Sequence, residues 1–85
     1  MTYRVQITRA AAKTIQALDK PIRRRVLTAI EGLATNPRPH GCVKLTGHDA
    51  WRIRVGDYRI VYEIHDAVLL IIVIDAGHRR EIYRD

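Results

Sequence analysis

The segment Trp51–Tyr62, WRIRVGDYRIVY, constrains the fold more than any other part of the chain. In its first half, apolar residues alternate with Arg52 and Arg54, so an extended backbone sends the apolar side chains to one face and both guanidiniums to the other. Gly56-Asp57 supplies a tight turn, and the second half carries Arg59. The segment therefore predicts a β-hairpin with an arginine-bearing face, and planar guanidinium forks suit phosphate groups.

The length and charge of the chain limit the kinds of protein it can be. The 85 residues are expected to form one domain over residues 1–85, with a single compact core. Fifteen Lys and Arg against nine Asp and Glu give a formal net charge of +6, which favours nucleic acid or an acidic protein as a partner. Cys42 is the single cysteine, so no internal disulfide is expected. Since no apolar run approaches the ~20 residues of a membrane span, we expect a soluble, cytoplasmic protein without a membrane partner.

Periodicity before the hairpin predicts one strand and two helices. Tyr3–Ile7 alternates as a strand does, and Thr8 is a suitable N-cap for a helix over Arg9–Leu18. A second helix is expected over Pro21–Thr35, where apolar residues recur at spacings of three and four. The consecutive arginines 23–25 at its start are expected to form a solvated face. An antiparallel helical hairpin accommodates this pair of helices.

The remaining segments complete an α+β fold. Residues 36–50 are loop-like, and His40 and His48 within them are expected to be exposed. Val68–Ile74 is apolar on both faces and predicts a central strand. We therefore expect an N-terminal strand, a helical hairpin and then a three-strand antiparallel meander, which forms a small curved sheet with the helices on one face. The arginines of the hairpin would point to the other, uncovered face.

With these elements in place, the chain resembles the toxins of the RelE/ParE superfamily of type II toxin–antitoxin systems. The resemblance includes the strand from Tyr3, the helical hairpin, KLTG at residues 44–47, the hairpin of Trp51–Tyr62, and the closing GHRREIY at residues 77–83. The closing His-Arg and Tyr favour the RelE branch, whose members cleave mRNA in the ribosomal A site. Members of the ParE branch poison DNA gyrase instead.

The resemblance implies a function, partners and site residues. It implies a ribosome-dependent, metal-independent mRNA endoribonuclease, a hydrolase-class toxin that inhibits translation and needs no cofactor. It also implies a RelB-like antitoxin, in a complex that binds its own operator DNA. The positions that match the family's active site are Arg52, Arg54, Arg59, Arg79 and Tyr83. Two features depart from the best-known members: residues 52 and 54 are lysines there, and the tail from residue 79 to residue 83 is shorter here.

RNA cleavage without a metal needs more than positive charge. The 2′-hydroxyl must lose a proton, the 5′-oxygen must gain one, and the charge of the phosphorane must be stabilised. Arginines meet the last need but are poor bases, because their pKa lies above ~12. His78, beside Arg79, is therefore the candidate for proton transfer, and Tyr83 can orient or deprotonate the 2′-hydroxyl or stack on a base. No metal site is expected, because the histidines are scattered and Cys42 is alone.

Simpler interpretations stay open for each of these residues. Arg52 and Arg54 can be ordinary outward residues of an amphipathic strand, and Arg59 can pair with an acid. His78 can be a turn residue, and Tyr83 can dock the tail on the sheet. Two other functions also stay open: a ParE-like gyrase poison, which needs no proton-transfer residue, and a catalytically weak RNA-binding member of the same fold.

Overall fold

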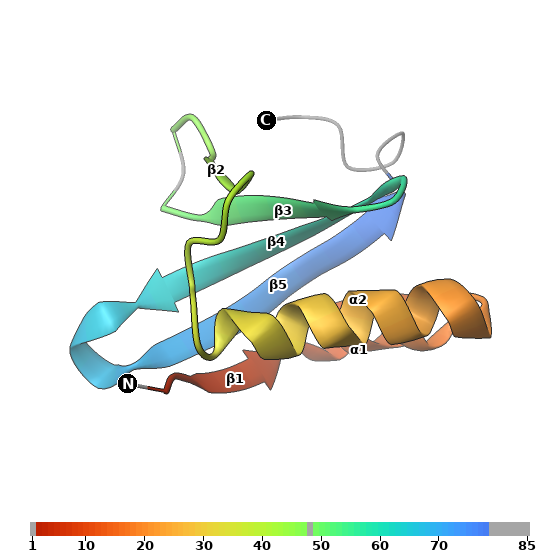
Figure 1. Ribbon diagram of the computed structural model, residues 1–85, viewed down its shortest axis with the longest axis horizontal. Coiled ribbons are helices and arrows are strands. Elements are labelled where there is room, and N and C mark those ends of the chain that lie inside the picture. The colour runs from red at the N-terminus through yellow and green to blue at the C-terminus, as the bar shows by residue number, and fades with distance from the viewer. Residues whose placement is uncertain (1, 48, 79–85) are drawn as a thin grey trace.

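The computed structural model describes residues 2–47 and 49–78, which form two helices on one face of a five-stranded sheet (Figure 1). The elements follow one another in this order: β1 (Arg4–Ile7), α1 (Arg9–Gln16), α2 (Lys20–Leu33), β2 (Val43–Lys44), β3 (Trp51–Val55), β4 (Tyr58–His65), the 3₁₀ helix η1 (Asp66–Val68) and β5 (Leu70–His78). The fold is α+β with a strand before the helical pair, as predicted. Neither helix of this described part is long and apolar enough to cross a bilayer.

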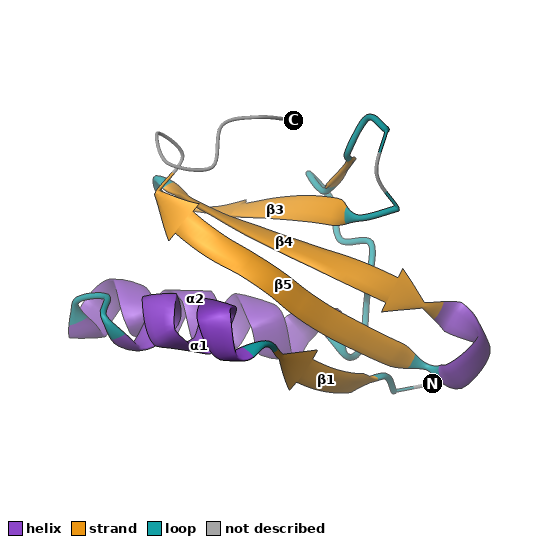
Figure 2. Cartoon of the chain, turned by 180° about the vertical axis from the view of Figure 1, so that it is seen from behind, coloured by secondary structure: helices purple, strands orange, loops and turns teal. Residues whose placement is uncertain are grey.

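The sheet is larger than the three-strand meander expected from the sequence. Its strand order is β1-β5-β4-β3-β2, so β5 lies between β1 and β4 (Figure 2). β3, β4 and β5 are antiparallel as predicted, but β1 adds to β5 in parallel and β2 adds to β3. β2 was not predicted because its two residues are exposed and show no alternation. Only the pairing with Trp51 and Arg52 defines it.

Local signals set the start of both helices. The hydroxyl oxygen of Thr8 accepts a hydrogen bond from the backbone N–H of Ala11 at 3.2 Å, which makes Thr8 the N-cap of α1. Asp19 occupies the N-cap of α2 without a side-chain hydrogen bond to the helix. Pro21 follows in the first turn, where the missing N–H leaves no helical bond unmade.

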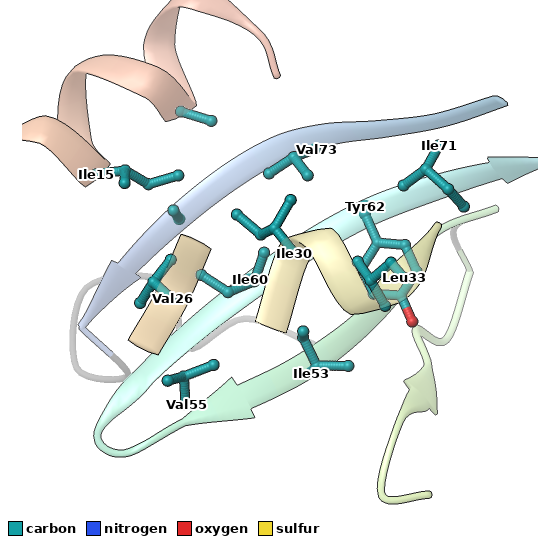
Figure 3. Close-up of a cluster of buried hydrophobic side chains, with 12 residues drawn as sticks. Ile15, Val26, Ile30, Leu33, Ile53, Val55, Ile60, Tyr62, Ile71 and Val73 are labelled. Carbon is teal, nitrogen blue, oxygen red and sulfur yellow. The ribbon is translucent and has the colours of Figure 1, made fainter. Parts of the chain in front are cut away.

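The core lies between the helices and the sheet (Figure 3). Ala11 and Ile15 enter it from α1, and one apolar stripe of α2 meets side chains of three strands. The largest fully buried side chains are Val26, Leu33, Ile60, Tyr62, Ile71 and Val73. Because burial of each large apolar side chain contributes about 1.5–3 kcal/mol, this layer fixes which sheet face turns away from the helices.

A bulge in β5 reverses the phase of its side chains. The pairing of β4 with β5 skips Ile74, which is the extra residue. Before the bulge, Ile71 and Val73 are fully buried in the core, and after it Ala76 is buried instead. Odd-numbered residues therefore face the helices in the first half of the strand, and even-numbered residues face them in the second half.

Candidate active site

Arg54 of β3 and Arg59 of β4 are direct cross-strand partners on the sheet face that turns away from the helices. The Cβ atoms of such partners lie about 5 Å apart, so the two side chains start from adjoining points. Arg52 is two residues before Arg54 in β3, where it pairs with Val61, and shares this face. The register thus brings together the three hairpin arginines that the sequence predicts to share a face.

The three arginines differ in their exposure. Arg54 is exposed and Arg52 is half-buried, whereas the exposed fraction of Arg59 is only 4%. Arg59 lies between Arg54 on one neighbouring strand and Gly77 on the other. The expectation of an uncovered face is therefore correct at Arg54 and wrong at Arg59. A buried guanidinium is held in place before any ligand arrives, which favours electrostatic stabilisation of a developing charge.

Arg52 and Arg54 also line a pocket of about 370 Å³ at the edge of the sheet. Among the described residues, β2 pairs only with Trp51 and Arg52, so the remainder of β3 is an open edge. The pocket is bounded by α2, by the loop before β2 and by β3, through Ala29, Gly32, Pro39, His40, Gly41, Arg52, Ile53 and Arg54. Two arginines and one histidine are thus among the residues that line one cavity.

A second pocket, of about 510 Å³, lies beside the first, toward the β3–β4 turn. It is lined by Arg24, Arg25, Thr28, Ala29, Arg54, Val55 and Gly56. Because Ala29 and Arg54 line both pockets, we call the pair the α2–β3 groove. Four arginines of the described chain border this groove, so it is strongly basic.

The three consecutive arginines of α2 have two different roles. Arg23 donates from Nη1 to the carbonyl oxygens of Gln16 at 3.2 Å and Leu18 at 3.4 Å, so it satisfies acceptors at the end of α1. Arg24 and Arg25 are exposed and line the α2–β3 groove. The predicted solvated face is therefore wrong for Arg23 and incomplete for the other two.

His78 lies on the other sheet face from Arg52, Arg54 and Arg59. The register pairs His78 with Tyr58, while Arg59 pairs with Gly77, so His78 projects from the opposite face of the sheet. Its ring meets that of Tyr58 edge to face, with the centroids 5.5 Å apart. The bulge at Ile74 is the cause, because an unbroken β5 would turn His78 to the face of Arg59. This geometry does not support the proton-transfer role expected of His78.

The other two predicted site residues, Arg79 and Tyr83, lie outside the described residues. Within residues 2–47 and 49–78, no three His, Cys, Asp or Glu side chains gather so that they could hold a metal ion. The sequence predicts His40 to be a solvent-exposed loop residue, with RNA contact as the alternative. It is exposed, but it also lines the pocket beside Arg52 and Arg54.

An ionic cluster fastens the loop that carries His40. Arg38 donates from Nη2 to Asp66 Oδ2 at 2.9 Å, and its guanidinium lies 5.1 Å from the centroid of the Trp51 ring. The hydroxyl of Tyr3 donates to the other oxygen of Asp66. The hydrogen bonds from Arg38 and then Tyr3 lower the pKa of Asp66, and the bond to Asp66 raises the pKa of Tyr3. The loop is thereby tied to β3 and η1, and Tyr3, just before β1, binds the same carboxylate.

Two hydrogen bonds to backbone carbonyl oxygens hold the same loop. The hydroxyl of Tyr62 donates to the carbonyl oxygen of Pro37 at 2.7 Å. Tyr62 is fully buried, and this burial raises its pKa above the ordinary value. The N–H of Cys42 donates to the carbonyl oxygen of Pro39 at 3.0 Å. The segment between α2 and β2 is therefore shaped by specific contacts, although it contains no regular element.

Comparisons with known proteins define the class of this chain. A family model described as the ParE toxin of the type II toxin–antitoxin system parDE matches residues 5–83. A protein of Escherichia coli described as RelE-like toxin is 33% identical over 82 residues, which are 93% of this chain and 85% of that protein. The chain therefore belongs to the RelE/ParE toxin family of type II toxin–antitoxin systems.

Solved structures place the chain more narrowly, beside RelE toxins. RelE in the archaeal RelE–RelB complex from Pyrococcus horikoshii OT3 superposes with a TM-score of 0.84 at 34% identity, over 93% of this chain and 97% of that one. The intact E. coli RelBE toxin–antitoxin complex gives a TM-score of 0.78 at 25% identity, over 89% of this chain and 95% of the matched chain. The predicted resemblance is confirmed, and the chain is RelE-like.

Proposed function

We propose that this chain is a toxin that cleaves mRNA in the ribosomal A site and thereby inhibits translation. The observation that carries the proposal is the opposition of Arg54 and Arg59 on one sheet face, with Arg52 two residues away. Cationic forks at fixed points on a strand pair complement the non-bridging oxygens of a phosphodiester. Preorganised donors of this kind contribute roughly 3–4 kcal/mol each to the stabilisation of a transition state.

The reaction that suits these residues is an internal transesterification of RNA. The 2′-oxygen attacks the adjacent phosphorus, the P–O5′ bond breaks, and the products carry a 2′,3′-cyclic phosphate and a 5′-hydroxyl. Arginines stabilise the phosphorane charge in this scheme, so a metal ion is not required. The α2–β3 groove, with Arg24 and Arg25 at its far end, offers further contacts to the flanking phosphates.

An antitoxin partner is the second part of the proposal. The relatives from Pyrococcus and E. coli were solved as complexes of RelE with RelB. We propose that a RelB-type antitoxin holds this chain inactive as well, and that the complex binds its own operator DNA. A net charge of +6 favours a partner whose docking segment is acidic. Co-expression with the product of the adjacent reading frame should restore growth and yield one stable complex, and continued growth arrest would argue against this pairing.

Primer extension on mRNA from cells that express the chain tests the cleavage. We expect cuts within codons of translated regions, and none in untranslated RNA. Replacing Arg52 and Arg54 with alanine should lower the cleavage rate by about 100-fold or more. The matched control replaces Arg4 and Arg9 with alanine, two exposed arginines outside the groove that change the charge equally. Intact mRNA in growth-arrested cells would contradict the proposal.

Poisoning of DNA gyrase is a second candidate, because the matching family model describes ParE toxins. A gyrase poison acts by binding, so it needs the basic surface but no proton-transfer group. The two functions separate in the same cells: gyrase poisoning gives DNA breaks and an SOS response while translated mRNA stays intact. Codon-level cuts without an SOS response would exclude it.

A further inference from the structure

We infer that His40 is the general base of the RNA cleavage, taking the proton from the 2′-hydroxyl. This inference rests on the proposed function and names the proton acceptor that the arginines do not supply. Its basis is a shared cavity: His40 lines the pocket of about 370 Å³ together with Arg52 and Arg54. His78, the acceptor expected from the sequence, projects from the other face of the sheet.

The backbone fixes His40 relative to Arg52 through a turn and a strand pair. The N–H of Cys42 donates to the carbonyl oxygen of Pro39 at 3.0 Å, so residues 39–42 form a β-turn with His40 in the second place. Gly41, in the third place, has φ of +92°, the positive value that a type II turn needs there. Val43 follows the turn at once and pairs with Arg52. A short, hydrogen-bonded path thus connects the imidazole to the arginine strand.

The residues before the turn are also held by specific contacts. Arg38 binds Asp66 at 2.9 Å and covers the Trp51 ring, and the carbonyl of Pro37 accepts the hydrogen bond of the buried Tyr62. His40 itself is exposed, so its ring is accessible to a ligand that enters the pocket. A side chain that is accessible on a fixed backbone can be presented to a substrate at a defined place, as a general base requires.

The chemical types of the residues that line the pocket indicate which of them can accept the proton. Of the described residues that line it, only His40 carries an imidazole, whose unprotonated ring nitrogen is a proton acceptor, whereas a guanidinium has donors and no acceptor. The neutral imidazole takes the 2′-hydroxyl proton while the 2′-oxygen forms its bond to phosphorus. The P–O5′ electron pair goes to the 5′-oxygen, which takes a proton from water, and the imidazolium returns its proton to the hydroxide so formed. Arg52 and Arg54 bind the non-bridging oxygens throughout.

Single-turnover cleavage of mRNA on purified ribosomes tests His40→Ala. We expect the cleavage rate to fall by about 100-fold or more, while binding to the programmed ribosome changes by less than about twofold. Imidazole added to the buffer should restore part of the rate in His40→Ala and none in Arg52→Ala, because it replaces a base and not a guanidinium. His65→Ala is the control, since His65 is exposed at the end of β4 beside Glu63.

The outcomes separate the inference from the proposed function. Wild-type protein that cleaves, with His40→Ala cleaving equally fast, would overturn the role of His40 and leave the proposed function intact. Loss of cleavage without imidazole rescue, together with weaker ribosome binding, would reassign His40 to a binding contact and also overturn the inference. Wild-type protein that leaves mRNA uncut on the ribosome would remove the proposed function, and the inference with it.

Discussion

Arg54 and Arg59 face each other across the β3–β4 pair, so two guanidiniums share one cross-strand position. Like charges in direct opposition destabilise a strand pair, by roughly 0.2–1 kcal/mol. Both side chains lie where the proposed function places the phosphodiester. The two arginines are therefore expected to lower the stability of the strand pair while they support the proposed activity.

Arg54→Thr should make the protein more stable and less active. Removing the exposed partner relieves the repulsion, and threonine is favoured in strands, so the free energy of unfolding should rise by about 0.5 kcal/mol and Tm by roughly 2–4 °C. Thermal unfolding followed by circular dichroism measures this change. Arg4→Thr is the matched control, because Arg4 is an exposed strand residue opposite Leu70. Equal gains in both variants would show that strand propensity, and not repulsion, is responsible.

Asp66→Asn should make the stability less dependent on acid. The folded pKa of Asp66 is lowered by Arg38 and Tyr3, so its contribution is present above the unfolded pKa of about 3.9 and is lost as the pH falls through the folded pKa. Wild type should therefore be more stable than Asp66→Asn at pH 7, and the gap should be smaller at pH 3. Urea unfolding at both values measures it. Asp57→Asn, in the exposed β3–β4 turn, is the control and should show a smaller gap.

The sequence predicts the hairpin and the helices well because their signals are local. Alternation in residues 51–55 and the Gly56-Asp57 turn suffice to specify β3, β4 and the arginine face. Gly56 has φ of +59°, as the first turn residue of a type II′ hairpin requires. β2 is different, because two residues carry no periodicity and become a strand only by pairing with Trp51 and Arg52, which lie seven and nine residues away from their partners. Such a strand cannot be predicted from its own two residues, because it forms only when the folded chain brings its partner beside it.

The sequence does not show on which sheet face His78 lies, for a related reason. Val68–Ile74 is apolar on both faces, so the pattern contains no information on which residues face the helices. A single extra residue at Ile74 then reverses the phase of the rest of β5. The signal for His40 was present in the sequence: Pro39-His40-Gly41 is typical of a turn. What the sequence could not show is that this turn closes against Arg52.

Tyr62→Phe should loosen the loop before β2. The substitution keeps the buried ring but removes the hydroxyl that donates to the carbonyl oxygen of Pro37 at 2.7 Å. The free energy of unfolding should therefore fall by about 1 kcal/mol, and by more if no water molecule replaces the lost hydrogen bond. Hydrogen exchange should also become faster at the N–H of Cys42, which closes the following turn. Tyr58→Phe, at the other end of β4, is the control. Unchanged exchange at Cys42 in Tyr62→Phe would show that this bond does not hold the turn.

Gly41→Ala should lower cleavage more than its effect on stability explains. Gly41 has φ of +92° and Gly47 has φ of +76°, and a Cβ at either would meet no atom within 4 Å, so alanine adds backbone strain at both and a clash at neither. Each substitution should lower the free energy of unfolding by roughly 1–2 kcal/mol.

Only Gly41 adjoins His40 in the turn that closes on Arg52, so relief of the strain there would displace the imidazole from the pocket. We expect Gly41→Ala to cleave mRNA at least about tenfold more slowly than Gly47→Ala, because a misplacement of about 1 Å is enough to slow a positioned reaction strongly. Single-turnover rates at a temperature where both variants are fully folded measure the difference. Equal rates in the two variants would show that the geometry of the turn does not control the reaction.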